Sequence, residues 1–307
     1  MNHRAGDAMA KRLRTVNNSD PIFAKLLAET NQQESTRTQL IAALEEKFDN
    51  RCVLLFFTSF WHPVIISNAD ADMIEGVLQK SDLSRGLMVV INSPGGDALA
   101  AERIINVCRA YTGGNFEAVV PKMAKSAATM ICLGARKIWM SKTSELGPVD
   151  PQVLRENRIT SAYSIIKSYE ELLQTAVQTS GHIEPYLQQL SVYDPSEIKD
   201  LRTLLELSAS IAVTALQTGM LNGHDEDSLR GKIKPFLDPE VTRSHGRMIN
   251  LDAVQNCGLA IQEIPLQSEV WSLLWELYIR ADWYVTNRCS KLVQTTKHQF
   301  EVPLPPQ

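Results

Sequence analysis

The sequence predicts an α/β protein built on a parallel sheet. Short apolar, β-branched runs at 52–57, 87–91 and 116–120 are typical of buried strands. Segments 68–78 and 98–111 lie between them and carry apolar residues at helical spacing. Strands that alternate with helices in this way favour a parallel sheet joined by right-handed crossovers.

The chain divides into four parts. Residues 1–20 are polar and basic and are predicted to be a disordered tail, and 21–50 form a helical segment. Residues 51–265 form the core. Residues 266–307 combine a Trp-rich helix, expected over 267–291, with a Pro-rich extended tail. Packing of this helix on its own core or on a partner stays open.

Further elements follow within the core. A short strand is predicted at 138–140, and helices are predicted at 127–135, 160–180 and 195–221. Ile65 and Ile66 are candidates for another strand.

Composition excludes several classes of protein. Lys and Arg total 31 against 35 Asp and Glu, a net charge of −4, which argues against nucleic-acid binding. The five cysteines are scattered without a C-x-x-C pair, and the histidines show no ligand spacing, so we expect a reducing compartment and no metal. No apolar run reaches the ~20 residues of a membrane span, and we find no signal peptide. We therefore expect a cytoplasmic protein and leave peripheral membrane contact open.

A serine lies where a strand meets a helix. Ser126 follows the strand that ends near Pro121, and Ala127 begins an apolar helix. The N–H of Ala127 belongs to a helix N-terminus, where free donors and partial positive charge can receive an oxyanion. Two interpretations stay open here, a helix N-cap and a nucleophile.

A second loop at the same sheet edge contains a Pro-Gly-Gly turn. Gly95 and Gly96 permit positive φ and a close approach of another group to bare backbone. The spacing matches neither the dinucleotide nor the phosphate-loop fingerprint. Asp97 is expected to cap the following helix or to tie down the loop, and we favour the cap.

Three motifs in order carry a resemblance: INSPGG at 91–96, KSAAT at 125–129 and ELGPVDPQ at 145–152. Over about residues 51–264 the chain resembles the ClpP/crotonase superfamily, and within it the serine dehydrogenase proteinase family. That family is related to signal peptide peptidase A and the stomatin-cleaving membrane proteases. The resemblance implies stacked ββα repeats, a Ser126 nucleophile and an oxyanion hole from Gly95, Gly96 and Ala127. It also implies an ATP-independent peptidase without cofactor, a peptide or protein substrate and a homo-oligomer.

The base is predicted less directly. No histidine occurs between Ser126 and His182, so a Clp-type triad is not expected. The resemblance to the lysine-dependent branch points to Lys167, at the border of an apolar helix face, where burial would lower the pKa of the amine. Lys125 is a rival, which we expect to turn away from the hydroxyl and to serve structure or a substrate carboxylate. His245 is expected to fix a loop, with an approach to a catalytic centre in the oligomer as the alternative.

The sequence leaves two functions open for this protein. The first is a serine peptidase with a Ser126–Lys167 dyad. The alternative keeps the fold as a crotonase-like acyl-CoA enzyme or a non-catalytic scaffold. A serine at the corner with no carboxylate before Glu145 favours the peptidase.

Overall fold

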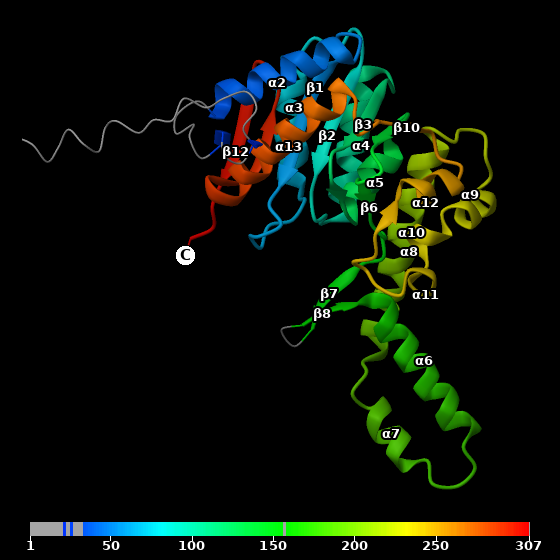
Figure 1. Ribbon diagram of the computed structural model, residues 1–307. Helices are drawn as coiled ribbons and strands as arrows, with labels where there is room; N and C mark the ends of the chain where they lie inside the picture. The colour runs from blue at the N-terminus through cyan, green and yellow to red at the C-terminus, as the bar shows by residue number, and fades with distance from the viewer. Residues whose placement is uncertain (1–20, 23–24, 27–32, 156–157, 307) are drawn as a thin grey trace, which may run out of the picture.

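The computed structural model describes residues 21–22, 25–26, 33–155 and 158–306. The predicted tail at 1–20 and much of the helix predicted at 21–50 lie outside these residues. The part of that helix that is described is α2 (Gln33–Lys47). The predicted α/β class is confirmed, because helices cover both faces of a central mixed sheet (Figure 1).

The main sheet has seven strands in the described part of the chain. In spatial order they are β10 (Ile261–Glu263), β5 (Ile138–Met140), β3 (Phe116–Val120), β2 (Leu87–Asn92), β1 (Cys52–Thr58), β11 (Cys289–Gln294) and β12 (Gln299–Pro303). The first five run parallel, as the β–α alternation predicts. The last two are antiparallel.

Alternate residues of the central strands separate two cores. In β1, Leu54 and Phe56 join one apolar cluster, while Leu55 and Phe57 join the other. This is the two-residue period of a strand that is buried on both faces. The helices over the first face are α3 (Asn68–Leu78), α4 (Ala98–Thr112), α5 (Ala127–Gly134) and α8 (Pro195–Gln217). The second face is covered by α2 and α13 (Glu269–Asn287).

Smaller elements surround the carboxyl edge of the sheet. A three-stranded sheet consists of β4 (Met123–Ala124), β6 (Glu145–Leu146) and β9 (Ile249–Asn250). The remaining helices are α6 (Ala162–Gln178), α7 (Glu184–Leu190), α9 (Glu226–Lys232), α10 (Lys234–Leu237), α11 (Pro239–Thr242) and α12 (Leu251–Asn256). The hairpin of β7 (Gln152–Arg155) and β8 (Arg158–Ser161) leads into α6 and α7, which project away from the sheet (Figure 1). Ile66 forms one bridge with Gly96 rather than a strand.

The C-terminal part differs from the prediction. The Trp-rich helix ends at Asn287 rather than at 291, and two strands that the sequence did not predict follow it as β11 and β12. Of the predicted extended tail at 302–307, Val302 and Pro303 belong to β12. All six side chains of β11 are buried, including the polar side chains of Ser290 and Lys291. Because polar residues occupy these buried positions, the sequence of β11 lacks the apolar alternation that predicts a strand. Helix α13 packs on its own core through Trp271, Leu274 and Leu277.

The described residues contain all five cysteines. All five cysteines are buried and free of disulfides, and burial raises the pKa of the Cys52 thiol to about 11 and that of Cys108 to about 12. No helix among these residues combines the length and apolar character that a membrane span requires.

A buried ion pair connects the C-terminal strands to the first core. Lys291 of β11 donates to Asp70 of α3 at 2.7 Å, and the Asp70 side chain is fully buried. Asp70 also accepts from the backbone N–H of Ser67, which closes a capping box at the start of α3. The pair therefore joins β11, which lies between β1 and β12 in the sheet, to a helix N-terminus 221 positions away in the sequence.

We predict that Lys291→Ala lowers the free energy of unfolding by about 3–5 kcal/mol, because it leaves the Asp70 charge buried and unpaired. Lys47 and Glu269 form a matched pair, also at 2.7 Å, but exposed to solvent. Lys47→Ala should therefore cost only about 0–1 kcal/mol. Urea unfolding of both variants measures the difference, and equal losses would contradict the assignment.

Candidate functional site

Ser126 occupies a strained corner between β4 and α5. Its backbone has φ 50° and ψ −119°, outside the regions that non-glycine residues usually adopt. It stands at the N-cap position of α5, yet its side chain makes no capping hydrogen bond. The simple interpretation of Ser126 as a helix cap therefore does not account for the hydroxyl.

The Pro-Gly-Gly loop lies directly against this corner. A Cβ on Gly95 would come within 2.6 Å of the Lys125 carbonyl oxygen and 2.7 Å of the Ser126 Cβ. Gly95 also has φ +103°, where a side chain is strained. The contact is fixed by a bridge between Ser93 and Ala124 on either side. Only glycine fits at position 95.

Two backbone donors remain free beside the serine. Ile66 donates to Gly95 and accepts from Asp97, so the Gly96 N–H faces away from this bridge. The Ala127 N–H is at the first position of α5, where no intrahelical acceptor exists. Among the described residues, neither N–H has an acceptor. The Gly95 N–H, in contrast, donates to the Ser93 hydroxyl at 3.2 Å. The geometry thus favours Gly96 and Ala127 as oxyanion donors and gives Gly95 a role in packing.

A cavity of about 500 Å³ opens in front of the serine. Its walls are mainly apolar and come from the Pro-Gly-Gly loop, α4, α8 and the β7–β8 hairpin. The largest apolar side chains in it are Ile65, Leu99, Met130, Leu154, Ile159, Leu204 and Leu207. A concave apolar site with a few polar groups is typical of substrate binding.

His245 lines the same cavity as Ser126. It belongs to the loop between α11 and β9, and its Nδ1 lies 2.9 Å from Oδ1 of Asp150. The Asp150 side chain is 2% exposed and accepts a second hydrogen bond from the Ser161 hydroxyl at 3.2 Å. A carboxylate accepts only, so Nδ1 donates, and in the neutral imidazole Nε2 then carries the lone pair. An imidazole oriented in this way can accept a proton.

Thr129 holds the corner against the segment that carries Asp150. Its buried hydroxyl donates to the Ala124 carbonyl at 2.7 Å and accepts from the Gly147 N–H at 3.1 Å. The Gly147-Pro148 turn is thereby fixed one turn of helix from Ser126. The three motifs of the sequence, at 91–96, 125–129 and 145–152, meet at one place.

Comparison with known proteins identifies the family. The model for ClpP-like SDH-type serine proteinases matches residues 30–183, which are 154 of the 307 residues. The chain belongs to this family. The match contains Ser126, the Pro-Gly-Gly loop and Asp150, but ends before His245.

Two curated relatives of the chain come from Methanocaldococcus jannaschii. The uncharacterized protein MJ0137 is 29% identical over 147 residues, which cover 46% of this chain and 50% of that protein. The uncharacterized protein MJ1495 is 31% identical over 88 residues, which cover 29% and 30%. The chain thus spans half or less of the length of these relatives.

Two solved structures of mutant forms of the 1510-N membrane-bound stomatin-specific protease are also similar. One has 13% identity, covers 68% of this chain and 96% of its own, and gives a TM-score of 0.28. The other, in complex with a substrate peptide, has 14% identity, covers 74% and 97%, and gives a TM-score of 0.29. At these TM-scores the superpositions carry no weight for the mechanism.

Lys167, which the sequence analysis predicted as the base for Ser126, lies on α6 outside the lining of the Ser126 cavity. Its side chain is 44% exposed and pairs with Glu240 at 3.1 Å. The hydrogen bond and the charge of Glu240 raise the pKa of Lys167, whereas a general base requires a lowered one. Lys167 is therefore not buried as the sequence predicted. The apolar side of α6 at Ile165 and Ile166 packs on α8, and Lys167 lies beside it in solvent.

The accessory residues follow the expectations more closely. Lys125 turns away from the serine and pairs with Glu145 at 2.6 Å, with a hydrogen bond to the Leu146 carbonyl. Asp97 is the N-cap of α4, because its carboxylate accepts from the Leu99 N–H at 2.9 Å. His245 hydrogen-bonds Asp150 as expected of a residue that fixes its loop, and it also lines the Ser126 cavity of its own chain.

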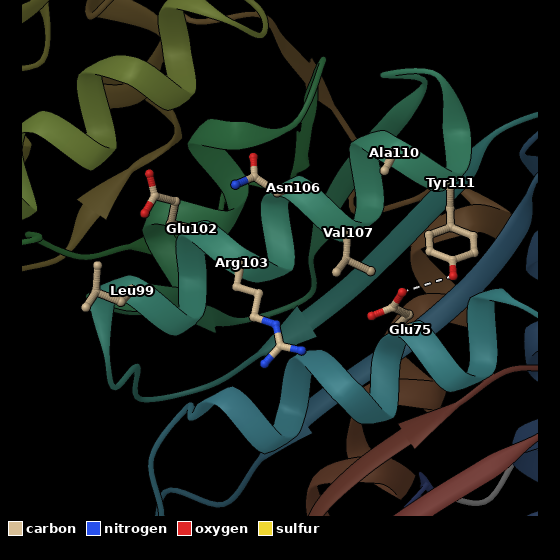
Figure 2. Close-up of a pocket in the computed structure, with 8 residues that line it drawn as sticks. All are labelled: Glu75, Leu99, Glu102, Arg103, Asn106, Val107, Ala110 and Tyr111. Carbon is tan, nitrogen blue, oxygen red and sulfur yellow. Dashed lines mark hydrogen bonds between the residues drawn. The ribbon is translucent and has the colours of Figure 1, made fainter.

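A separate depression lies on the surface between α3 and α4 (Figure 2). It encloses about 320 Å³ and shares only Leu99 with the Ser126 cavity. Three of its polar side chains are engaged with the protein itself: the Tyr111 hydroxyl donates to Glu75 at 3.0 Å, and Arg103 pairs with Asp72. Each pair joins α4 to α3, so the depression is the boundary between these two helices.

We predict that Gly95→Ala disrupts the corner and abolishes labelling of Ser126 by an active-site probe. The matched control is Gly114→Ala, where φ is +84° but no atom lies within 4 Å of the new Cβ. That control should show only the backbone strain of about 1–2 kcal/mol. Urea unfolding and labelling of both variants separate strain from collision, and normal labelling of Gly95→Ala would contradict the described contact.

Proposed function

We propose that this protein is a serine peptidase in which Ser126 is the nucleophile and His245, oriented by Asp150, is the base. The observation that carries the proposal is the uncapped Ser126 hydroxyl, which shares a cavity with His245 and has two free N–H donors beside it. Membership of a serine proteinase family supports the same reaction.

The steps follow from the positions of the groups. The Ser126 Oγ attacks the carbonyl carbon of a peptide bond while Nε2 of His245 accepts its proton. The N–H groups of Gly96 and Ala127 stabilise the negative charge on the former carbonyl oxygen. His245 then donates the proton to the departing amine, and water hydrolyses the acyl-enzyme by the reverse sequence.

The proposed base, His245, differs from Lys167, the base predicted from the sequence. A Ser126–Lys167 dyad would require an uncharged lysine at the serine. The ion pair between Lys167 and Glu240 and the exposure of Lys167 favour its charged form. The chemistry of the cavity therefore supports His245 over Lys167.

We predict that a fluorophosphonate probe labels Ser126 in the wild type and that Ser126→Ala abolishes labelling. His245→Ala should lower the labelling rate by about 10²–10⁴, the usual contribution of a general base. Asp150→Asn should also lower it, because the amide no longer fixes the donor tautomer of His245. Lys167→Ala should leave the rate unchanged.

We also propose that the substrate is a peptide or protein and that the protein forms a homo-oligomer. Because activity can depend on the oligomer, the labelling is carried out on each fraction from gel filtration. Labelling that is lost in Lys167→Ala, retained in His245→Ala and confined to alkaline pH would return the base to Lys167. Failure to label any fraction, together with tight binding of acyl-CoA, would replace the peptidase with the crotonase-like alternative.

A further inference from the structure

A second cavity, of about 460 Å³, lies beside α13 on the opposite face of the main sheet. Three of its aromatic side chains, Trp275, Tyr278 and Trp283, come from α13. The fourth, Trp61, follows β1 and is 77% exposed. The cavity shares no lining residue with the one at Ser126.

A carboxylate lies among these rings. Asp282 of α13 is half-buried, and its carboxylate accepts a long hydrogen bond, 3.5 Å, from the Asn92 amide. In the described residues, no basic side chain forms an ion pair with Asp282. Burial raises the pKa of Asp282, and the more distant charge of Lys122 only partly offsets that effect. The negative charge is therefore desolvated without a direct counter-charge.

The rings already attract cations within the protein. The Lys122 Nζ lies 5.7 Å from the centroid of the Tyr278 ring, and the Arg288 guanidinium lies 5.9 Å from the Trp283 ring. Both distances fall within the range of cation–π attraction. Lys122 is exposed and lines the cavity, so it can be displaced by a ligand of the same charge.

We propose that this cavity binds an organic ammonium group, held between the faces of Trp61, Trp283 and their neighbours and the carboxylate of Asp282. Aromatic walls with one carboxylate are suited to an alkylated ammonium, because such a cation is large, weakly hydrated and attracted to ring faces. The site is independent of the Ser126 reaction and adds a binding function to the protein.

The test uses choline and its uncharged isostere, 3,3-dimethyl-1-butanol, with the full chain in isothermal titration calorimetry. Choline should bind at least about tenfold more tightly than the isostere. Asp282→Asn and Trp61→Ala should each raise the Kd of choline by about tenfold. Trp61 is exposed, so its removal leaves the core intact. Lys122→Gln should lower the Kd, because it removes the competing cation.

Two controls identify the site. Ser126→Ala should bind choline as the wild type does, and so should Asp252→Asn, which removes an exposed carboxylate elsewhere on the surface. Equal affinity for choline and the isostere, or binding unaffected by Asp282→Asn, would overturn the proposal. Adsorption to phosphatidylcholine vesicles that free choline does not compete and Asp282→Asn does not weaken would overturn it in favour of a membrane-contact surface.

Discussion

The close contact between Gly95 and the Ser126 corner is the constraint on which the site depends. The loop and the corner follow two different strands, β2 and β3, and meet with no space for a side chain at position 95. This contact surrounds Ser126, which has a positive φ, and Gly96 lines the same cavity as the serine. A strained residue persists only where its surroundings fix it, and such residues concentrate at functional sites. Here the surroundings are the Ser93–Ala124 bridge and the Thr129 hydroxyl.

The two faces of the main sheet carry different chemistry. The face under α4 and α5 ends in the Ser126 cavity, and the face under α13 ends in the aromatic cavity around Asp282. Both lie at the carboxyl edge of the parallel strands, where ligands bind in folds of this kind. Asn92, the last residue of β2, is close to both: its amide reaches toward Asp282, and Ser93 and Gly95 follow directly. The two cavities therefore lie on opposite faces of the sheet, and the segment at the end of β2 lies close to both.

The antiparallel strands β11 and β12 show how the C-terminal part becomes integral to the fold. The polar residues of β11 are buried with specific partners: Lys291 pairs with Asp70, Ser290 donates to the Val302 carbonyl, and Gln294 accepts from Arg37. A sequence pattern detects strands through apolar alternation, and β11 lacks it. The same segment pairs with β1 and so extends the main sheet.

The sequence by itself determined the α/β class, the central strands and helices nearly to the residue, and the meeting of Ser126 with the Pro-Gly-Gly loop. These follow from local periodicity and from the rule that parallel strands end at one edge. Tertiary structure alone decided the surroundings of the candidate bases. Lys167 lies on the edge of an amphipathic helix, and only the packing of α6 on α8 decides that its amine meets Glu240 in solvent. His245 and Asp150 are 95 positions apart, and no local pattern joins them. Their hydrogen bond arises because the loop after α11 returns to the edge where β6 ends, a contact that depends on the folding of the whole intervening chain.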